Sequence, residues 1–503
     1  MPSPVRVRYA PSPTGDPHVG NIRQALFDWL LARSTGGAFV LRIEDTDRNR
    51  YVPSAVAAQL DALRWLGLDW DEGPDVGGPY APYVQSQRLD LYHAAAHRLI
   101  ESGHAYECYC SEERLDALRN EQRELRQPPG YDGRCRTDAG RAEAKAEAGG
   151  APAVVRFKMP REGETVFHDY IRGDVTFKNA LIDDFVILKS DGFPTYHLAQ
   201  AVDDHEMKIT HVIRNEEWLP SAPRHKLLFE ALGHELPVFV HTASILGPDR
   251  SKLSKRHGAQ SVLEYRDLGY LPRAVFNFLG LLGWSLDDHT EIISRDDFVK
   301  HFSLDRLLKS PAVFNLEKLD WMNGEYMRAL ADDEFVRLVV EWLEKPEDEG
   351  GLPPSVARPI GADYTRRMVP IVKERVKLLS KAREMMDFFY LPEPLDLDAG
   401  VLLGERFKDD RSQAALLVSE ALVLAEQTGE WTAAPLEQAY RALAERLGAR
   451  FRDLAGLMRA AITGRTVSPP LLESMDILGR ERCLRRLRDA LNLILPVCPP
   501  PGV

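Results

Sequence analysis

The stretch Pro11-Ser12-Pro13-Thr14-Gly15-Asp16-Pro17-His18-Val19-Gly20-Asn21 decides the fold of the N-terminal region. A short apolar alternation ending at Tyr9 precedes it, and an amphipathic run beginning at Ile22 follows it, so we expect a strand-to-helix turn. Such a turn directs backbone N–H groups and the positive end of a helix dipole at an anion, and phosphate is the usual guest. The sequence therefore predicts a phosphate-binding turn near the N-terminus.

A second short stretch, Lys252-Leu253-Ser254-Lys255-Arg256, lies on a loop bounded by Gly247-Pro248 and Gly258. Mobile cations suit a phosphate whose negative charge grows as a bond breaks. Each stretch alone is a weak signal, because a His-x-Gly turn is usually an incidental helix start and a basic run is usually a solvated loop. Taken together, the two stretches predict a nucleoside triphosphate that is bound from two sides.

Composition places the chain among soluble proteins of several domains. Its 503 residues exceed what one core usually supports, and its contents of 44% hydrophobic and 28% charged residues are ordinary for globular protein. The longest apolar-looking run, residues 276–284, is too short to span a bilayer, and the N-terminus lacks the apolar segment of a signal peptide. Three of the 5 cysteines cluster at positions 108, 110 and 135, which is not a disulfide framework. We therefore expect a cytoplasmic enzyme that does not associate with membranes.

The charge of the chain leaves a nucleic-acid partner open. The formal net charge of −12 argues mildly against a protein covered by nucleic acid, but local patches decide binding. Two clusters of basic residues are candidates, and each is equally well interpreted as a solvated helix face. They comprise Arg366, Arg367, Lys373, Arg375, Lys377, Lys381 and Arg383, and then Arg480, Arg482, Arg485, Arg486 and Arg488.

The order of the predicted elements is that of an α/β protein with a helical C-terminal region. Strands alternate with helices over about the first seventy residues, which implies a parallel sheet. Between residues 72 and 182 the periodicity changes and we expect an insertion, after which the α/β pattern resumes at residue 185. Helical periodicity dominates from residue 363 to 495. Ligands of parallel sheets lie beyond the carboxyl ends of the strands, and both His18 and residues 43–47 follow strands at that end.

These motifs together resemble those of bacterial glutamyl-tRNA synthetase, a class I aminoacyl-tRNA synthetase. The resemblance covers essentially the whole chain and is strongest from residue 5 to residue 330. One position departs from the wider class, because Asn21 stands where many class I enzymes have histidine, a departure that is seen within the glutamyl branch. The motifs that carry the resemblance are Pro11–Gly15, His18–Asn21, Arg42–Asp47, Ser190–His197, Arg214–Trp218 and Lys252–Arg256.

The resemblance implies a Rossmann-type parallel-sheet catalytic domain with an inserted α+β domain, followed by an all-α anticodon-binding region. We expect the two halves of the catalytic domain over residues 1–82 and 184–250, separated by an acceptor-stem-binding domain over 83–183 that carries the cysteine cluster. A stem-contact domain with the basic loop is expected over 251–330, and the helical anticodon-binding domain over 331–503. A monomer is the expectation for this family.

The activity that the resemblance implies has two steps. The α-carboxylate of glutamate attacks the α-phosphate of ATP, pyrophosphate leaves, and the 3′-terminal ribose of glutamate tRNA then takes the glutamyl group. Mg²⁺ is expected on the phosphates, and the protein supplies mainly position and charge. In this family, activation generally awaits tRNA binding.

The resemblance also implies roles for individual residues. His18, Lys252 and Lys255 are the implied catalytic residues. The implied contacts to ATP are Pro11, His18, Gly20, Asn21, Lys252, Ser254, Lys255 and Arg256. The implied contacts to glutamate are Arg8 and Arg214 for the carboxylate, Glu44 for the ammonium, and Ser12 and Tyr196 as supporting donors. The alternative for Arg8 and Arg214 is a structural ion pair with Glu44 or Glu216.

Cys108, Cys110 and Cys135, with Tyr131 nearby, resemble the zinc motif of some bacterial glutamyl enzymes. Thr137 stands where the family's histidine ligand is expected, so a three-thiolate site is incomplete unless Tyr131 or another side chain supplies the fourth donor. The alternative is three ordinary thiols in a degenerate site.

Other functions remain open at this level. A nucleotidylyltransferase shares the His-x-Gly turn and the basic loop but does not need the helical third of the chain, and a paralogue that glutamylates a tRNA base lacks an anticodon-binding region. An inactive tRNA-binding protein would not need the phosphate-site residues. By the resemblance, Arg375 falls near an arginine associated with accepting only glutamate tRNA.

Overall fold

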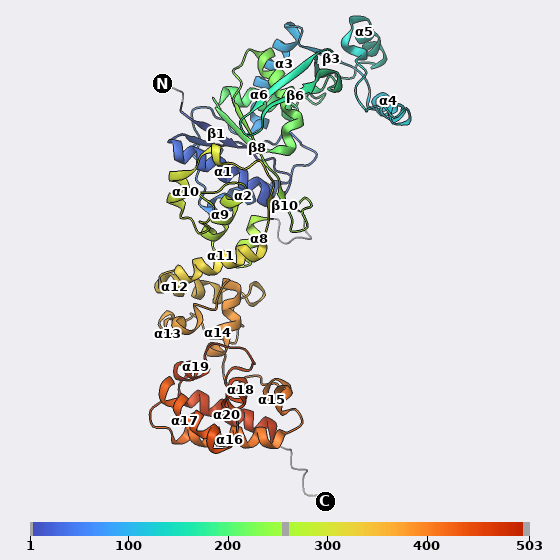
Figure 1. Cartoon of the computed structure of the whole chain (residues 1–503). Helices are drawn as coiled ribbons and strands as arrows, with labels where there is room; N and C mark the ends of the chain where they lie inside the picture. The colour runs from blue at the N-terminus through green and yellow to red at the C-terminus, as the bar shows by residue number, and fades with distance from the viewer. Residues whose placement is uncertain (1–3, 254–260, 496–503) are drawn as a thin grey trace, which may run out of the picture. The chain divides into compact units, whose positions relative to one another are not determined.

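The computed structural model describes residues 4–253 and 261–495, which divide between two compact units. Unit 1 extends to Tyr265 and resumes from Pro272 to Leu316, and unit 2 comprises Arg266–Leu271 and the chain from Glu317 onward. Unit 1 contains sheets and helices, whereas unit 2 is built from helices (Figure 1). The predicted fold class, an α/β region followed by an all-α region, is confirmed. The five domain boundaries expected from the sequence stay a prediction.

The strands all belong to unit 1, and the described residues of unit 2 contain none. They are β1 (Arg6–Tyr9), β2 (Ala38–Leu41), β3 (Ala105–Cys108), β4 (Val154–Phe157), β5 (Glu164–Asp169), β6 (Gly173–Lys178), β7 (Val186–Leu188), β8 (His211–Asn215), β9 (Val238–Thr242), β10 (Ile245–Leu246) and β11 (Ala312–Val313). The helices of unit 1 are α1 (Val19–Thr35), α2 (Pro53–Leu66), α3 (Leu89–Glu101), α4 (Glu112–Glu124), α5 (Asp138–Glu147), α6 (Tyr196–Glu206), α7 (Ala222–Leu232), α9 (Pro272–Leu281) and α10 (Arg295–His301). Helix α8 (Val262–Asp267) begins in unit 1 and ends in unit 2.

A parallel arrangement of strands forms the centre of unit 1. β1 pairs in parallel with β2, with Val7 opposite Phe39, and β8 pairs in parallel with β9. The two pairs meet where the N–H of Thr210 donates to the carbonyl of Arg6 at 2.9 Å. The carboxyl ends of these strands therefore share one edge, which is where ligands of parallel sheets bind.

Helix α1 is more deeply buried than its sequence pattern suggests. The amphipathic run predicts one exposed face, yet polar residues of α1 are buried as well, among them Arg23, Gln24 and Asp28. The guanidinium of Arg23 donates to the carbonyls of Leu282 at 3.0 Å and Ala243 at 2.6 Å. The helix is buried because strands cover one side of it and α9 and α10 cover the other. Its N-terminus is thus held in a fixed place at the edge of the sheet.

The insertion expected between residues 72 and 182 contains β3, β4 and the hairpin β5–β6. Strand β7 lies beyond residue 185, where the α/β pattern is expected to resume, yet it pairs antiparallel with β4 and belongs to the sheet β3–β4–β7. β5 then joins β9 through the pair Asp169 and Phe239, so the hairpin extends the sheet that contains β8 and β9. The aromatic rings of Phe157 and Phe185 pack 5.4 Å apart in the core beneath β3–β4–β7.

Local sequence explains how two helices of unit 1 begin or end. Gly67 ends α2 and Gly233 ends α7, each in the left-handed conformation with φ of 69° and 70°, which glycine adopts without strain. Ser221 stands at the N-cap of α7, but its side chain makes no capping hydrogen bond, because a 3₁₀ turn (η4, Glu216–Ser221) leads directly into the helix.

Unit 2 confirms the predicted helical region. Its helices are α11 (Leu316–Ala329), α12 (Asp332–Leu343), α13 (Ala362–Val372), α14 (Ala382–Tyr390), α15 (Ala399–Phe407), α16 (Arg411–Gln427), α17 (Ala433–Arg446), α18 (Phe451–Thr463), α19 (Leu471–Leu478) and α20 (Arg480–Ile494). The first residue of α11, Leu316, still belongs to unit 1. The proline- and glycine-rich segment 346–354 is a loop, and its Leu352 is fully buried. Among the described residues, no helix combines the length and apolar character needed to cross a bilayer.

Candidate active site

His18 occupies the N-cap of α1, at the carboxyl edge of the sheet. The N–H of Gly20 donates to His18 Nδ1 at 3.0 Å. Because an amide N–H can only donate, Nδ1 is unprotonated and the neutral ring carries its proton on Nε2. Burial lowers the pKa of His18, and so does the positive charge of Lys252, while Glu217 acts in the opposite direction. The neutral ring therefore offers an N–H donor beside a helix N-terminus, which suits a phosphate oxygen.

The residues that follow His18 keep this donor in place. A Cβ on Gly20 would lie 3.3 Å from His18 Nδ1, so glycine allows the backbone to approach the ring closely. The N–H of Asn21 donates to the carbonyl of His18 at 2.9 Å, and the side chain of Asn21 is exposed. The carbonyl of Pro11 accepts the N–H of Glu44 at 3.0 Å, which ties the turn to the segment after β2.

Lys252 lies close enough to His18 for its charge to lower the histidine pKa. Its Nζ is 2.9 Å from Glu217 Oε2, and its side chain is 81% exposed. An exposed ion pair of this kind contributes little to stability, so Lys252 can exchange Glu217 for another anion.

The chain returns to His18 directly after the basic stretch. Ser261 forms a bridge with His18, and the N–H of Val262 donates to the carbonyl of Pro17 at 3.0 Å. Three predicted ATP contacts, Ser254, Lys255 and Arg256, lie outside the described residues. Lys252, which precedes these three residues, and Ser261, which follows them, both lie near His18 at the N-terminus of α1.

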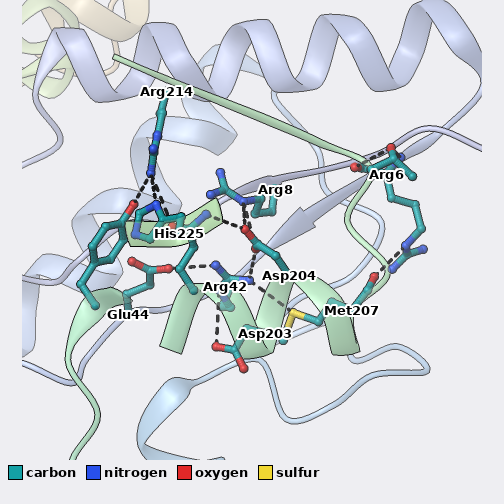
Figure 2. Close-up of polar contacts among 12 residues, drawn as sticks. Arg6, Arg8, Arg42, Glu44, Asp203, Asp204, Met207, Arg214 and His225 are labelled. Atoms are coloured by element: carbon teal, nitrogen blue, oxygen red, sulfur yellow. Dashed lines mark hydrogen bonds and ion pairs between the residues drawn. The ribbon is translucent and has the colours of Figure 1, made fainter. Parts of the chain in front are cut away.

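Arg8, on β1, takes part in a buried network of charges (Figure 2). Its Nε donates to Asp204 at 3.1 Å, and Arg42 donates to the same carboxylate at 2.7 Å. Arg42 also donates to Glu44 at 2.9 Å and lies 3.8 Å from Asp203. The predicted alternative for Arg8, an ion pair with Glu44, is wrong in its partner, because Glu44 pairs with Arg42. The two terminal nitrogens of Arg8 have no hydrogen-bond partner among the described residues.

Arg214, at the end of β8, has a different environment. Its Nε is 2.9 Å from His241 Nε2, and one terminal nitrogen is 3.0 Å from His225 Nδ1 and 3.1 Å from the hydroxyl of Tyr196. Burial lowers the pKa of Arg214, with Tyr196 acting in the opposite direction. Within residues 4–253 and 261–495 the guanidinium has no carboxylate within ion-pair distance. The predicted alternative, an ion pair with Glu216, is wrong, because Glu216 pairs with Arg172.

Of the remaining predicted glutamate contacts, Ser12 and Glu44 lie on loops and Tyr196 lies at the start of a helix. Tyr196 is the first residue of α6, and its ring packs 4.7 Å from the ring of Trp218. Ser12 lies exposed in the turn before α1, where its carbonyl accepts the N–H of Thr14 at 2.9 Å. The described structure thus places Arg8, Glu44, Tyr196 and Arg214 in one connected region, with Ser12 on the loop that Pro11 ties to Glu44.

Sequence reasoning missed Asp204, which joins Arg8 to Arg42, and Gln200, which donates to Asp204 at 3.0 Å. A signal for both was present, because Tyr196, Gln200 and Asp204 recur at four-residue spacing on α6. It also missed His225 and His241, whose places in the sequence carry no comparable signal.

The three clustered cysteines come together in the inserted region. The Sγ atoms of Cys108, Cys110 and Cys135 all lie within 4.8 Å of one another. The hydroxyl of Tyr131 is 3.5 Å from Cys108 Sγ and 3.8 Å from Cys110 Sγ. Thr137 is not part of the cluster, because its side chain caps α5 by accepting the N–H of Gly140 at 3.2 Å. Three thiols at this spacing supply three of the four ligands of a structural Zn²⁺ site, and the hydroxyl of Tyr131 is an oxygen atom beside them.

Arg375 lies in unit 2, in the turn after α13, and is exposed. Its charge, together with the stronger effect of burial, lowers the pKa of Arg459 on α18. The two arginines therefore lie close enough for their positive charges to interact.

Two family models match the chain over the two regions that the structure separates. "tRNA synthetases class I (E and Q), catalytic domain" matches residues 4–321, and "Anticodon binding domain" matches residues 334–491. The second match covers the region that neither a nucleotidylyltransferase nor a paralogue that modifies a tRNA base is expected to have.

Similar proteins extend over the full length. A glutamate–tRNA ligase of Dehalococcoides mccartyi is 51% identical over 98% of this chain and 98% of its own, and one of Moorella thermoacetica is 46% identical over 97% and 98%. A crystal structure of a glutamate tRNA ligase from Elizabethkingia meningosepticum in complex with its amino acid has a TM-score of 0.83 and 33% identity, covering 97% of this chain and 99% of that one. The chain therefore belongs to the glutamate–tRNA ligase family of class I tRNA synthetases.

Proposed function

We propose that this chain attaches glutamate to glutamate tRNA in two steps, forming glutamyl-adenylate from glutamate and ATP and then transferring the glutamyl group to the 3′-terminal ribose. The observation that carries the proposal is Arg214, a buried cation whose partners among the described residues are all neutral. A buried charge without a counterion is costly, so such a site favours an anionic ligand. The side-chain carboxylate of glutamate is an anion of suitable size and geometry for a guanidinium.

Arg8 and Glu44 supply the remaining recognition. Burial alone would raise the pKa of Asp204, but Arg8 and Arg42 lower it, so Asp204 stays ionised and holds both arginines. The free terminal nitrogens of Arg8 are donors for a second carboxylate oxygen. Burial raises the pKa of Glu44 even though Arg42 counteracts it. The ammonium of glutamate would give Glu44 a further cation and return it to the ionised form, with Ser12 and Tyr196 as supporting hydrogen-bond partners.

The turn before α1 and the basic stretch would hold ATP. Pro11, Gly20 and Asn21 shape the turn, and the Nε2–H of His18 would donate to an oxygen of the α-phosphate. When the α-carboxylate of glutamate forms its bond to that phosphorus, the bond to the bridging oxygen breaks and pyrophosphate leaves. The developing charge is balanced by His18 and by the cations of the basic stretch, Lys252, Lys255 and Arg256, with Ser254 as a hydrogen-bond donor. Mg²⁺, which accompanies ATP, would neutralise the other phosphate oxygens.

The helical unit is the proposed site of tRNA recognition. Its match to an anticodon-binding family supports this role, and the exposed Arg375 is a candidate contact. The insertion that carries the cysteine cluster is proposed to bind the acceptor stem. We also propose that the chain acts as a monomer in the cytoplasm, where the unpaired thiols of its four described cysteines would persist.

Zn²⁺ is the proposed occupant of the cysteine cluster. The three sulfur atoms would be its thiolate ligands, and the hydroxyl of Tyr131 would be the fourth donor. The metal would fix β3 to the 3₁₀ turn η2 (Arg134–Arg136) and so set the shape of the insertion.

Aminoacylation of purified glutamate and glutamine tRNAs, measured side by side, tests the function. We expect charging of glutamate tRNA with glutamate, ATP and Mg²⁺. Equal charging of glutamine tRNA would remove the role of Arg375 in discrimination, and charging of neither would overturn the proposal.

Arg214→Ala tests the amino-acid site. We expect kcat/KM for glutamate to fall by about 100-fold, because a charge-assisted contact is lost, while KM for ATP stays unchanged. The measurement is ATP–pyrophosphate exchange in the presence of tRNA. An unchanged kcat/KM would show that glutamate binds elsewhere.

A further inference from the structure

The surroundings of Arg214 suggest how selectivity for glutamate over glutamine is built. Resting on the proposed role of Arg214 in binding the glutamate side chain, we propose that His225 and His241 are positioning residues. They hold the guanidinium through imidazole lone pairs and leave its positive charge uncompensated until the substrate carboxylate arrives. Both side chains are fully buried, and neither carries a role that the sequence motifs imply.

The protonation of His241 follows from its partners. Arg214 has only N–H donors, so His241 Nε2, at 2.9 Å from its Nε, must accept through a lone pair. The ring proton is then on Nδ1, which donates to Asp169 at 2.6 Å. Asp169 also accepts the N–H groups of Ile171 at 3.1 Å and Arg172 at 2.9 Å. Burial would raise the pKa of Asp169, but the contact with His241 and the backbone N–H of Arg172 lower it, so Asp169 stays ionised. Asp169 therefore fixes the tautomer that His241 presents to Arg214.

The protonation of His225 follows in the same way. Its Nδ1 lies 3.0 Å from a terminal nitrogen of Arg214 and must accept, so its proton is on Nε2. That N–H donates to His197 Nδ1 at 2.9 Å. Figure 2 shows His225 directly beneath Arg214, linked to it by a dashed contact. Burial lowers the pKa of both His225 and His241, so both rings stay neutral at neutral pH.

The other groups around Arg214 are neutral too. They are the hydroxyl of Tyr196, the amide oxygen of Gln200 at 3.4 Å, the carbonyl of Trp218 at 3.4 Å and the ring of Phe239, whose centre is 5.0 Å from the guanidinium carbon. Two charged groups beyond ion-pair distance act on Arg214 in opposite directions: the positive charge of Arg8 lowers its pKa and the negative charge of Asp204 raises it. Asp169 is separated from the guanidinium by a whole imidazole. The network thus orients Arg214 through neutral acceptors, with no carboxylate of the described residues within ion-pair distance.

This arrangement separates orientation from charge compensation. If a protein carboxylate paired with Arg214, the guanidinium would be nearly as well satisfied without substrate, and an amide would compete better with the glutamate carboxylate. With only neutral acceptors, the buried cation gains far more from a carboxylate than from an amide.

The tautomers can be read directly in the wild-type protein. In ¹⁵N NMR of histidine-labelled protein, we expect His225 to be protonated on Nε2 alone and His241 on Nδ1 alone near neutral pH. His225 would be assigned by comparison with His225→Asn, and His241 by comparison with His241→Gln. An imidazolium or the opposite tautomer at either residue would overturn the proposal, and this measurement does not require an altered protein to be active.

A matched pair of variants isolates the charge. Asn and Asp at position 225 have the same shape, and both place an acceptor oxygen near the position of Nδ1, but only Asp adds a negative charge. We expect His225→Asn to keep most of the preference for glutamate over glutamine in adenylate formation. We expect His225→Asp to raise KM for glutamate and reduce that preference by about 10- to 100-fold, with KM for ATP unchanged.

A second pair, His241→Gln and His241→Glu, makes the same comparison at the other imidazole that contacts Arg214. This pair replaces the first if His225→Asp does not fold. Equal selectivity of the Asp and Asn variants, or of the Glu and Gln variants, would overturn the inference. Failure of the proposed function looks different, because the wild-type protein would then form no glutamyl-adenylate, or Arg214→Ala would retain full activity.

Discussion

At the scale of single residues, two arginines with the same expected role differ in their surroundings. Arg8 is partly neutralised by Asp204, so an ion-pair interpretation of Arg8 is correct in kind, with an unexpected partner. Arg214 is surrounded by lone pairs and aromatic rings instead. The difference matters because a neutralised arginine orients a ligand, whereas an uncompensated one selects for its charge.

Lys255→Ala tests the basic stretch at the same scale. We expect adenylate formation to fall by about 100- to 1,000-fold, as when one transition-state charge contact is lost, with little change in glutamate binding. Single-turnover formation of adenylate, with tRNA present, measures the step. A near-normal rate in this variant would remove Lys255 from the mechanism.

At the scale of elements, the start of α1 joins the turn to the sheet. His18 depends on Gly20 in two ways, since the glycine N–H fixes the tautomer and the missing Cβ leaves room for the ring. The helix itself is buried on nearly all sides, so its N-terminus cannot shift easily. A small change at Gly20 therefore acts on the imidazole rather than on the helix.

Gly20→Ala tests this dependence. The added Cβ would lie 3.3 Å from His18 Nδ1 and 3.7 Å from Cε1, so the ring must move by a few tenths of an ångström. We expect adenylate formation to slow by about tenfold with an unchanged unfolding temperature, because positioning is lost and packing is not. Gly429→Ala, where a Cβ meets nothing within 4 Å, is the control and should behave as wild type. Equal rates for the two variants would contradict the prediction.

The cysteine cluster is a second test at the scale of elements, because it connects β3 to η2. We expect carefully purified protein to contain about one zinc per chain and Cys110→Ser to lose it, with a lower unfolding temperature. Elemental analysis by mass spectrometry measures the metal. Cys483→Ser, which alters a buried thiol on α20, should retain the zinc. Wild-type protein without stoichiometric zinc would contradict the prediction and would favour the alternative of three ordinary thiols.

At the scale of the whole molecule, the chain consists of two units of different architecture. Neutral histidines are concentrated in unit 1, and partial burial lowers the pKa of His197 to about 3 from the ordinary 6.5. In the unfolded chain His197 has the ordinary pKa, so it binds a proton that it does not bind in the folded chain. Stability contributed by this residue is therefore complete above pH 6.5 and is lost progressively as pH falls from 6.5 toward 3.

This linkage predicts the pH dependence of unfolding. When the pH is lowered from about 7.5 to about 5, the titration of His197 should lower the free energy of unfolding of unit 1 by about 2 kcal/mol. Urea unfolding at the two pH values measures the difference. In His197→Asn the difference should shrink by about the same amount, and an unchanged difference would show that His197 is not the titrating group.

The sequence by itself determined the local secondary structure of this protein and, through the order of its motifs along the chain, its family. Alternating apolar residues and turn residues specify a strand, a turn and a helix around His18, since these depend on neighbours in the chain. The ordered motifs identify the family, and the period of the C-terminal region specifies helices. Only the tertiary structure decided which charges meet. Asp204 lies 196 residues from Arg8, and the imidazoles that hold Arg214 come from α7 and β9. Protonation and charge compensation depend on such distant contacts and on burial, and neither is encoded in the order of nearby residues.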